Sequence, residues 1–358
     1  MTARGNWPVR LLRSDEAAAL HRLSVECFGD GAHSEAFVQQ RFCNGAAIAS
    51  DVVVAEGAGR LIGAQAVTYL SFFVGGRAET AGMFTDGMTH PDYRRRGIFR
   101  SLLLEAERRA YDRGASLLFT MPNDRSLPSF ERSPGWHILP DRILLARVLD
   151  VAGLFQDRGL PGLLARGMGA LTHWAVRNGG RLDAIGLTEV SELRPFAAEI
   201  DAIAERAIPQ HGVACDRGFA FLDWRFAQNP TWRYRYFVAT DAAGRLSAYL
   251  VTAGEQRIGT FLSYAADMLW TNEQSMIRLL DFSAAALKKD GSRLFGSIVT
   301  SPRLLRVLTK AGFRRVPRMV SKRCFHTAYA VHPDRPDVAA VARQSDGWFL
   351  SLADFDTI

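Results

Sequence analysis

One stretch of the chain changes its hydrophobic period across a single turn, and this change constrains the fold more than any other feature. The run RAETAGMFTDGMTH, residues 77–90, has the alternation of a strand. After the turn PDYRRRG, apolar residues recur every three to four positions from Ile98 until Gly114, which predicts an amphipathic helix. The apolar run ASLLFTMP, 115–122, then predicts a strand buried on both faces. Together these segments predict a β-α-β unit with its loop at the C-terminal end of the first strand.

The turn inside this unit has the composition of an anion site. A strand end followed at once by a helix start presents unpaired main-chain N–H groups and the positive end of the helix dipole. Gly97 leaves room for a phosphate at the backbone, and the arginines at 94–96 add charge-assisted contacts. The alternative is a solvated basic turn. The stretch lacks the lysine and hydroxyl of a P-loop and the three glycines of a dinucleotide fingerprint, which excludes both of those sites.

The segments before this unit predict one short strand, two helices and an antiparallel meander. The strand is PVRLLR, 8–13, and the helices begin at the caps Ser14 and Ser34 and end at Gly29 and Gly45. The meander consists of β-branched and aromatic runs joined by glycine turns, at 51–56, 61–74 and 77–90.

A similar order of elements recurs in the second half. It comprises a hairpin around Gly244, a strand at 258–270, a helix capped by Asn272, a strand at 292–300 and a helix that ends at Gly312. The glycine-punctuated segment between the halves predicts a connecting helix packed between domains.

The residues THPDYRRRGIFRSLL resemble motif A of the GCN5-related N-acetyltransferases (GNAT), whose pattern is [QR]-x-x-G-x-[GA] after a strand and a proline. Arg94 and Gly97 match this pattern, and Phe99 stands where the family has glycine or alanine. The segment MPNDRSLPSFERSPGW, 121–136, is similar to the family's next segment. The resemblance is specific over about 50–137, and over about 215–318 only the element order persists.

The resemblance implies an α/β (α+β) fold of the GNAT type, with a mixed, mostly antiparallel sheet flanked by helices, in two tandem GNAT-like domains. We therefore expect an acetyltransferase domain that binds acyl-CoA at 1–150, a helical connecting segment at 151–214 and a degenerate GNAT-like domain at 215–358. Asn272 and Glu273 stand where the second half would need arginines, so that half is expected to bind no coenzyme.

The resemblance also implies a site. The pyrophosphate of acetyl-CoA would lie on the turn, the main chain near Met88 and Thr89 would polarise the thioester carbonyl, and Asn123 would contact the pantetheine arm. The expected coenzyme-binding residues are Met88, Thr89, Arg94, Arg95, Arg96, Gly97, Ile98, Phe99, Arg100 and Asn123. The expected catalytic residues are Asp86, Met88 and Thr89, with Asp86 as the base.

The general acid and the base are the open points of this site. Phe130 stands where much of the family has a tyrosine, and phenylalanine has no proton to give. The alternative acids are Tyr69, Tyr93 and Tyr111. The alternative bases are Glu79, His90 and Glu131.

The function implied is acyl-CoA-dependent N-acyl transfer, with acetyl transfer to a primary amine of a small molecule such as an amino sugar. One alternative is an acyl-CoA-binding protein without turnover. The other is a basic module for nucleic acid or anionic surfaces, since the net charge is +7. We expect a small-molecule amine as partner and no nucleic acid. We also expect no membrane span and no metal, and a homodimer stays open.

The four cysteines are scattered, without a C-x-x-C pair or a histidine at metal-ligand spacing. They indicate reduced thiols, and with no apolar run of about 18 residues the chain is expected to be cytoplasmic.

Overall fold

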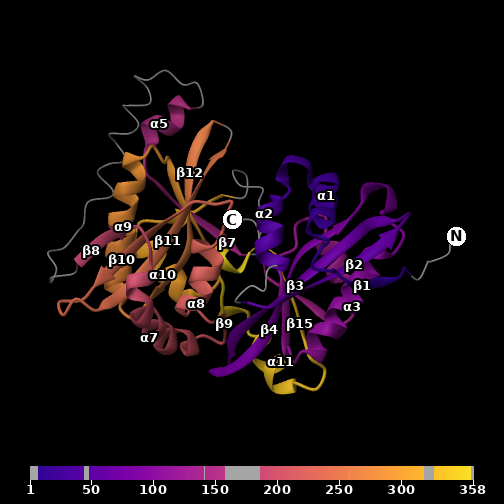
Figure 1. Ribbon diagram of the computed structural model, residues 1–358. Coiled ribbons are helices and arrows are strands. Elements are labelled where there is room, and N and C mark those ends of the chain that lie inside the picture. The colour runs from indigo at the N-terminus through magenta and orange to yellow at the C-terminus, as the bar shows by residue number, and fades with distance from the viewer. Residues whose placement is uncertain are drawn as a thin grey trace.

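Figure 1 shows a computed structural model of the chain, in which two lobes lie side by side, each with a mixed sheet flanked by helices. The structure describes residues 7–43, 48–140, 142–157, 186–257, 259–317 and 326–355. Its helices are α1 Ala17–Phe28, α2 Glu35–Val38, α3 Ile98–Asp112, α4 Leu127–Glu131, α5 Val151–Gln156, α7 Ala197–Ala207, α8 Phe219–Leu222, α9 Glu273–Lys289, α10 Pro302–Lys310 and α11 Pro336–Ala342. The fold is the mixed α/β type that the sequence predicts.

The first sheet has the strand order β1-β2-β3-β4-β5-β15-β6, and only β4 and β5 in this series run parallel. Its strands are β1 Val9–Leu11, β2 Ser50–Gly57, β3 Arg60–Val74, β4 Arg77–Thr89, β5 Leu117–Thr120, β6 Trp136–Leu139 and β15 Thr327–Val331. Two short strands extend it beside β3, namely β9 Val213–Cys215 and β16 Trp348–Phe349.

The second sheet has the order β14-β7-β13-β12-β11-β10-β8, and only β12 and β13 run parallel. Its strands are β7 Ile143–Val148, β8 Gly186–Val190, β10 Tyr234–Thr240, β11 Leu246–Arg257, β12 Thr260–Trp270, β13 Leu294–Val299 and β14 Arg314–Arg315. The order β12, α9, β13, α10 repeats the order β4, α3, β5, α4 of the first lobe.

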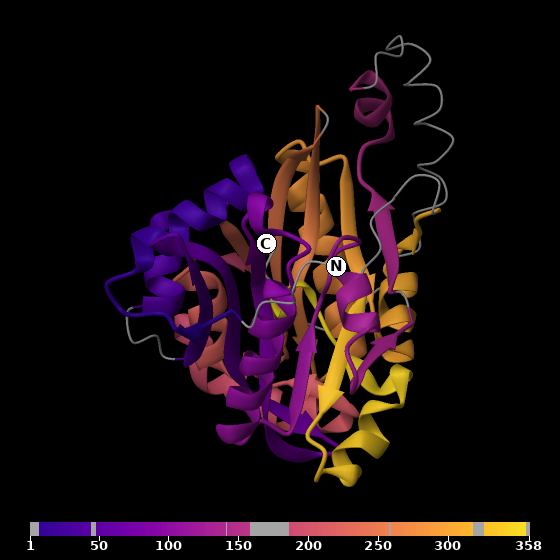
Figure 2. The same cartoon turned by 90° about the vertical axis from the view of Figure 1, so that its right-hand side faces the viewer.

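The two lobes exchange strands. β7 follows the first lobe in the chain but lies between β13 and β14 of the second sheet, while β15 lies between β5 and β6 of the first. Figure 2 shows β15, in yellow, beside the purple strands of the first sheet. The expected division at 1–150, 151–214 and 215–358 stays a prediction, and strands cross it in both directions.

Helices cover both faces of the first sheet because side chains alternate along its strands. Val53 of β2 belongs to the cluster under α3, with Leu102 and Ala106. Its neighbour Val54 belongs to the cluster under α1, with Leu20. Helices α1 and α3 therefore lie on opposite faces of this sheet (Figure 1).

Most of the local predictions in the first lobe are confirmed. The amphipathic helix predicted from Ile98 ends at Asp112, and the predicted buried strand is β5, each of whose four residues is buried. Ser34 caps α2 by accepting a hydrogen bond from the Phe37 N–H at 3.2 Å. The stop expected at Gly45 and most of the connecting helix lie outside the described residues.

The predicted cap at Ser14 is wrong. Helix α1 begins at Ala17, its N-cap is Glu16, and no side chain caps it. The Glu16 carboxylate instead pairs with the guanidinium groups of Arg10 and Arg13, each at 2.7 Å. The residue at the helix start is therefore held by two arginines close to it in sequence.

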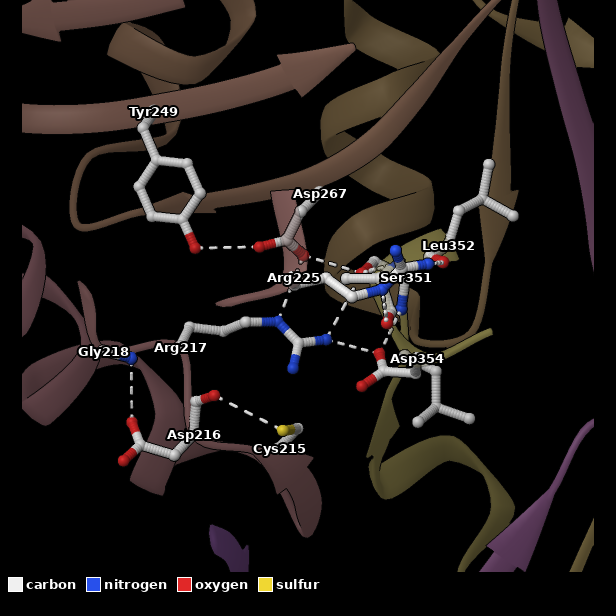
Figure 3. Close-up of polar contacts among 12 residues, drawn as sticks. Cys215, Asp216, Arg217, Gly218, Arg225, Tyr249, Asp267, Ser351, Leu352 and Asp354 are labelled. Carbon is white, nitrogen blue, oxygen red and sulfur yellow. Dashed lines mark hydrogen bonds and ion pairs between the residues drawn. The ribbon is translucent and has the colours of Figure 1, made fainter. Parts of the chain in front are cut away.

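The C-terminal segment is held by buried polar contacts (Figure 3). Arg217, whose side chain is fully buried, pairs with Asp267 of β12 at 3.1 Å and with Asp354 near the end of the chain. Ser351 donates a hydrogen bond to Asp267 at 2.7 Å. Arg225 donates to the main-chain oxygens of residues 352, 353 and 355. These contacts fix the last described turn against the second sheet.

Candidate active site

Strand β4 continues past the point where its partner β5 ends. The pairing of β4 with β5 stops at Phe84 and Thr120, and the Thr120 hydroxyl donates to the Phe84 carbonyl oxygen at 2.8 Å. β4 then runs on to Thr89 with β3 on its other side. Within the described part of the chain, the outer edge of β4 over 85–89 therefore has no strand partner. The Thr85 and Thr89 carbonyl oxygens accept side-chain hydrogen bonds, and the other main-chain groups of this edge can bind a ligand.

A β-bulge interrupts β4 at this unpaired stretch. Ala64 and Ala66 of β3 pair with Met88 and Thr85, so β4 contains one residue more than β3 between these two pairs. Asp86 takes the left-handed backbone conformation, with φ of 51°, which is uncommon for a residue other than glycine. A Cβ at Gly87 would lie 2.7 Å from Gln65 Oε1, so a larger residue there would have to displace the Gln65 side chain.

The turn between β4 and α3 leaves the helix start open. Gly97 is the N-cap of α3, with φ of 86° and no side chain to cap the first-turn N–H groups. A Cβ placed on Gly97 would have no atom within 4 Å. Arg95 also has a positive φ, of 63°. The first turn of α3 thus presents main-chain donors and the positive helix end at an unobstructed surface.

The arginines predicted to bind the coenzyme surround this helix start. The Arg94 Nε donates to the Thr89 carbonyl oxygen at 3.2 Å, and Arg96 donates to the Asp92 carbonyl oxygen at 2.9 Å. No carboxylate of the described residues pairs with any of the exposed arginines at 94, 95, 96 and 100. Their charge is therefore uncompensated, as a pyrophosphate site requires.

The residues after β5 reach the same region. The Asn123 side-chain oxygen accepts the main-chain N–H groups of Arg125 and Ser126, at 3.0 and 3.1 Å, in the turn before α4. Phe130 is 3% exposed, and its ring contacts Phe99 of α3 at 6.0 Å between centroids. Phe99 thus has an aromatic neighbour in its position at the helix start.

The carboxylate of Asp86 lies on the face covered by α1 and α2. Its Oδ1 is 3.2 Å from Nε2 of His33, in the loop before α2. The His33 ring stacks on Phe37 with 4.1 Å between centroids. Burial raises the pKa of Asp86, but His33 and the nearby Arg41 outweigh it and hold this pKa below its usual value. Asp86 is therefore ionised at neutral pH.

Sequence reasoning missed His33 and Arg41. Arg41 is 4% exposed, and its guanidinium lies 4.7 Å from the ring centre of Trp224 in the second lobe. A lone histidine in a loop and an arginine in a short helix carry no motif. Only the fold brings them to the bulge.

The alternative bases are placed elsewhere or are already paired. Glu79 pairs with Arg335, a contact that lowers the pKa of Glu79. His90 is buried, accepts the Asp92 N–H at 3.2 Å and contacts Glu26 at 3.4 Å. Glu131 is exposed.

The alternative acids have packing or hydrogen-bonding partners. The Tyr69 hydroxyl donates to Asp51 at 2.9 Å. The Tyr111 ring lies against His332, and Tyr93 packs beside His90. Burial raises the pKa of both Tyr69 and Tyr111.

The corresponding helix start in the second lobe is closed. The Asn272 side chain accepts the N–H groups of Gln274 and Ser275, at 2.8 and 3.1 Å. Glu273 pairs with Arg306 of α10. A cavity of about 590 Å³ lies beside the starts of α9 and α10. Its lining includes Glu273, Arg303 and Asp346, so side chains of positive and of negative charge face it.

Comparisons with solved structures show which proteins share this fold. The fold is similar to a probable N-acyltransferase of Enterococcus faecalis V583, at 10% identity and a TM-score of 0.65, covering 90% of this chain and 71% of that one. It is also similar to a GCN5-related N-acetyltransferase of Anabaena variabilis, at 12% identity and a TM-score of 0.62, covering 90% and 73%. The N-myristoyltransferase of Saccharomyces cerevisiae, solved with myristoyl-CoA, gives 10% identity and a TM-score of 0.60, covering 91% and 83%. The chain thus has the fold of the GNAT acyltransferases.

The sequence itself makes the assignment more specific. Residues 8–139 match the model of the acetyltransferase (GNAT) domain family. None of the curated proteins matches this sequence. Among the described residues, no helix is long and apolar enough to cross a membrane, and no group of three or more His, Cys, Asp or Glu side chains could hold a metal ion.

Proposed function

We propose that this protein transfers an acyl group, most simply acetyl, from acyl-coenzyme A to a primary amine of a small molecule. One observation carries the proposal. The uncapped start of α3, with its open Gly97 and uncompensated arginines, lies directly after the unpaired edge of β4. The start of α3 suits the negative charge of a diphosphate, and the edge of β4 suits the extended pantetheine arm with its amide groups.

Each part of this site has a role in the proposed reaction. The amides at the start of α3 and the arginines of the turn would hold the pyrophosphate, and the edge of β4 would bind the pantetheine arm. Main-chain N–H groups near Met88 and Thr89 would stabilise the negative charge that develops on the thioester oxygen. Asp86 is the proposed proton acceptor, and the thiolate would leave without a phenol at position 130.

The coenzyme is proposed to bind in the first lobe only. The capped start of α9 and the Glu273 carboxylate support this restriction, because both oppose phosphate binding. A tandem arrangement of two GNAT-like domains, with the second shaping the acceptor site, is part of the same proposal, as is a cytoplasmic location. The neighbour solved with myristoyl-CoA supports acyl-coenzyme A as the ligand class.

A thiol-release screen tests this function. The full chain is incubated with acetyl-CoA and a panel of amino sugars, polyamines and amino acids, beside calorimetric titration with coenzyme A. Release of thiol with one class of amine, together with saturable coenzyme binding, is the expected result. Coenzyme binding without thiol release for any amine would instead favour an acyl-CoA-binding protein without turnover. Phe130, which cannot act as a general acid, favours this alternative.

A further inference from the structure

Buried polar atoms without partners gather at the bulge of β4. They are Thr85 Oγ1, Asp86 Oδ2 and Thr89 Oγ1, all within five residues of one strand. Folded proteins satisfy nearly all buried polar groups, so such a group needs an explanation. The stretch is also the one that lacks a strand partner on the β5 side. These atoms therefore mark the stretch of β4 in which buried polar side chains are open to contacts from a ligand.

The Asp86 carboxylate is the charged member of this group, and its two oxygens differ. Oδ1 is held by His33 Nε2 at 3.2 Å, whereas Oδ2 is buried and lacks a hydrogen-bond partner. The adjacent Thr85 hydroxyl contributes to the lowered pKa of Asp86. The side chain of Asp86 is only 9% exposed, so little water reaches it. The positive φ of Asp86 adds local strain, a feature that clusters at functional sites.

The loop that carries His33 is itself fixed. Its ring stacks on Phe37, in the first turn of α2, and its carbonyl oxygen lies 3.0 Å from Nδ1 of His21 in α1. Both helices cover the face of the sheet to which Asp86 points. Helices α1 and α2 thus place one imidazole against one oxygen of the carboxylate.

We infer that His33 is a positioning residue for the acceptor amine: it holds Asp86 through Oδ1 so that Oδ2 receives a hydrogen bond, and then a proton, from that amine. This inference rests on the proposed function. It assigns His33, from the loop before α2, and Asp86, from β4, to the same proton transfer. The acceptor it implies is a primary amine that enters as the ammonium ion, because a cationic N–H donor both hydrogen-bonds a buried carboxylate oxygen and balances its charge.

The ammonium first loses one proton to solvent, and the resulting amine forms the C–N bond to the thioester carbon. The nitrogen becomes acidic as it gains positive charge, and its extra proton passes to Asp86 Oδ2. The C–S bond then breaks, its electron pair leaves with the coenzyme thiolate, and Asp86 returns its proton to solvent. No oxidant, metal or covalent enzyme intermediate takes part.

The charged groups that act on Asp86 come from two elements. His33 acts from the loop before α2, and Arg41 acts from the short helix Gln39–Cys43 that follows α2. Arginine keeps its charge over the accessible pH range, so the change expected on replacing His33 is assigned to His33 alone. Without it, burial would act on Asp86 with less opposition.

The experiment follows the carboxyl carbon of Asp86 by 13C NMR in the full chain, assigned by its loss in Asp86→Asn. In His33→Ala, the pH midpoint of this signal is expected to rise by about 1–3 units, the range for loss of a close opposite charge. His33→Gln keeps an N–H donor and is expected to restore part of the shift. His332→Ala, a partly exposed histidine in another loop, is the matched control and should leave the midpoint unchanged.

The acceptor is tested in the same samples with two probes. Ethanolamine hydrochloride should shift the Asp86 signal, and tetramethylammonium chloride should not, because it carries charge without a hydrogen to donate. With an amine that turns over, kcat should fall in His33→Ala and recover in part in His33→Gln, while coenzyme A affinity stays unchanged.

An unmoved midpoint in His33→Ala, or equal responses to the two cations, overturns the inference. Absence of thiol release with every amine, while the Asp86 signal responds as expected, overturns the proposed function instead. The two failures are therefore distinguishable. If His33→Ala does not fold, His33→Gln and the probe titration of the unaltered protein still decide the question.

Discussion

The open start of α3 gives the sharpest test of the coenzyme site. Gly97 and Gly114 flank this helix, and their backbones are almost the same, with φ of 86° and 84°. A Cβ at either glycine would meet nothing within 4 Å. The two differ in place alone, because Gly97 lies at the N-terminal end beside the arginines and Gly114 lies after the C-terminal end. Gly97→Val and Gly114→Val therefore form a matched pair.

The two variants share one cost and differ in another. Each forces a branched residue into the left-handed conformation, which costs roughly 1–2 kcal/mol of folding stability or somewhat more for valine. Only Gly97→Val also places methyl groups where the phosphate meets the helix amides. A hydrogen bond to a charged group contributes about 1.5–3 kcal/mol, so losing two costs about 3–6 kcal/mol. At 1.4 kcal/mol per tenfold, the affinity for coenzyme A falls about 10²–10⁴-fold.

Calorimetric titration with coenzyme A, beside urea unfolding, measures both quantities on the full chain. We expect similar losses of stability in the two variants and a loss of affinity in Gly97→Val alone. Equal affinities in the two variants would refute the assignment of the pyrophosphate to this turn. An affinity loss in both variants would show that strain in α3, rather than a blocked phosphate site, is responsible.

Three further perturbations test other parts of the structure. Arg217→Met leaves Asp267 and Asp354 without their buried cation, and should lower the free energy of unfolding by about 3–5 kcal/mol in urea titration. Phe130→Tyr adds a hydroxyl at a ring that is 3% exposed; turnover should rise or stay level, and a sharp fall with coenzyme binding intact would show that the ring serves packing alone. Burial lowers the pKa of His211 from 6.5 to about 4, so the unfolded chain takes up a proton that the folded chain does not, and stability falls as the pH drops through this window. His211→Gln should remove that part of the fall, measured as the urea midpoint at pH 7 and pH 5.

Local patterns in the sequence were sufficient for most elements of the first lobe. Glycine stops, the change of period at Gly97 and the apolar run of β5 each depend on residues close together in the chain. The cap at Ser14 failed because a competing contact was stronger: the Glu16 carboxylate pairs with two arginines. That competition is invisible to a rule based on residue type at the helix start.

The exchange of β7 and β15 could not be predicted for a different reason. Both are short apolar strands, and nothing in Ile143–Val148 or Thr327–Val331 specifies which sheet receives them. Pairing between residues more than 180 apart, as between Thr327 and Leu139, depends on packing of the complete chain. The same limit applies to the site. The turn at 94–97 has a local signature, whereas His33 reaches Asp86 only through the packing of α1 and α2 on the sheet.

The strand exchange also bears on how the two lobes can share one function. β15 occupies the position between β5 and β6, and β5 is the strand whose end leaves the β4 edge open. The chain that supplies β15 then passes through the buried contacts of Arg217 and Asp354 against the second sheet. The geometry of the proposed coenzyme site in the first lobe therefore depends on the fold of the second, even though the second has a closed helix start of its own. A second lobe that is proposed to bind no coenzyme is still required for the first sheet to be complete.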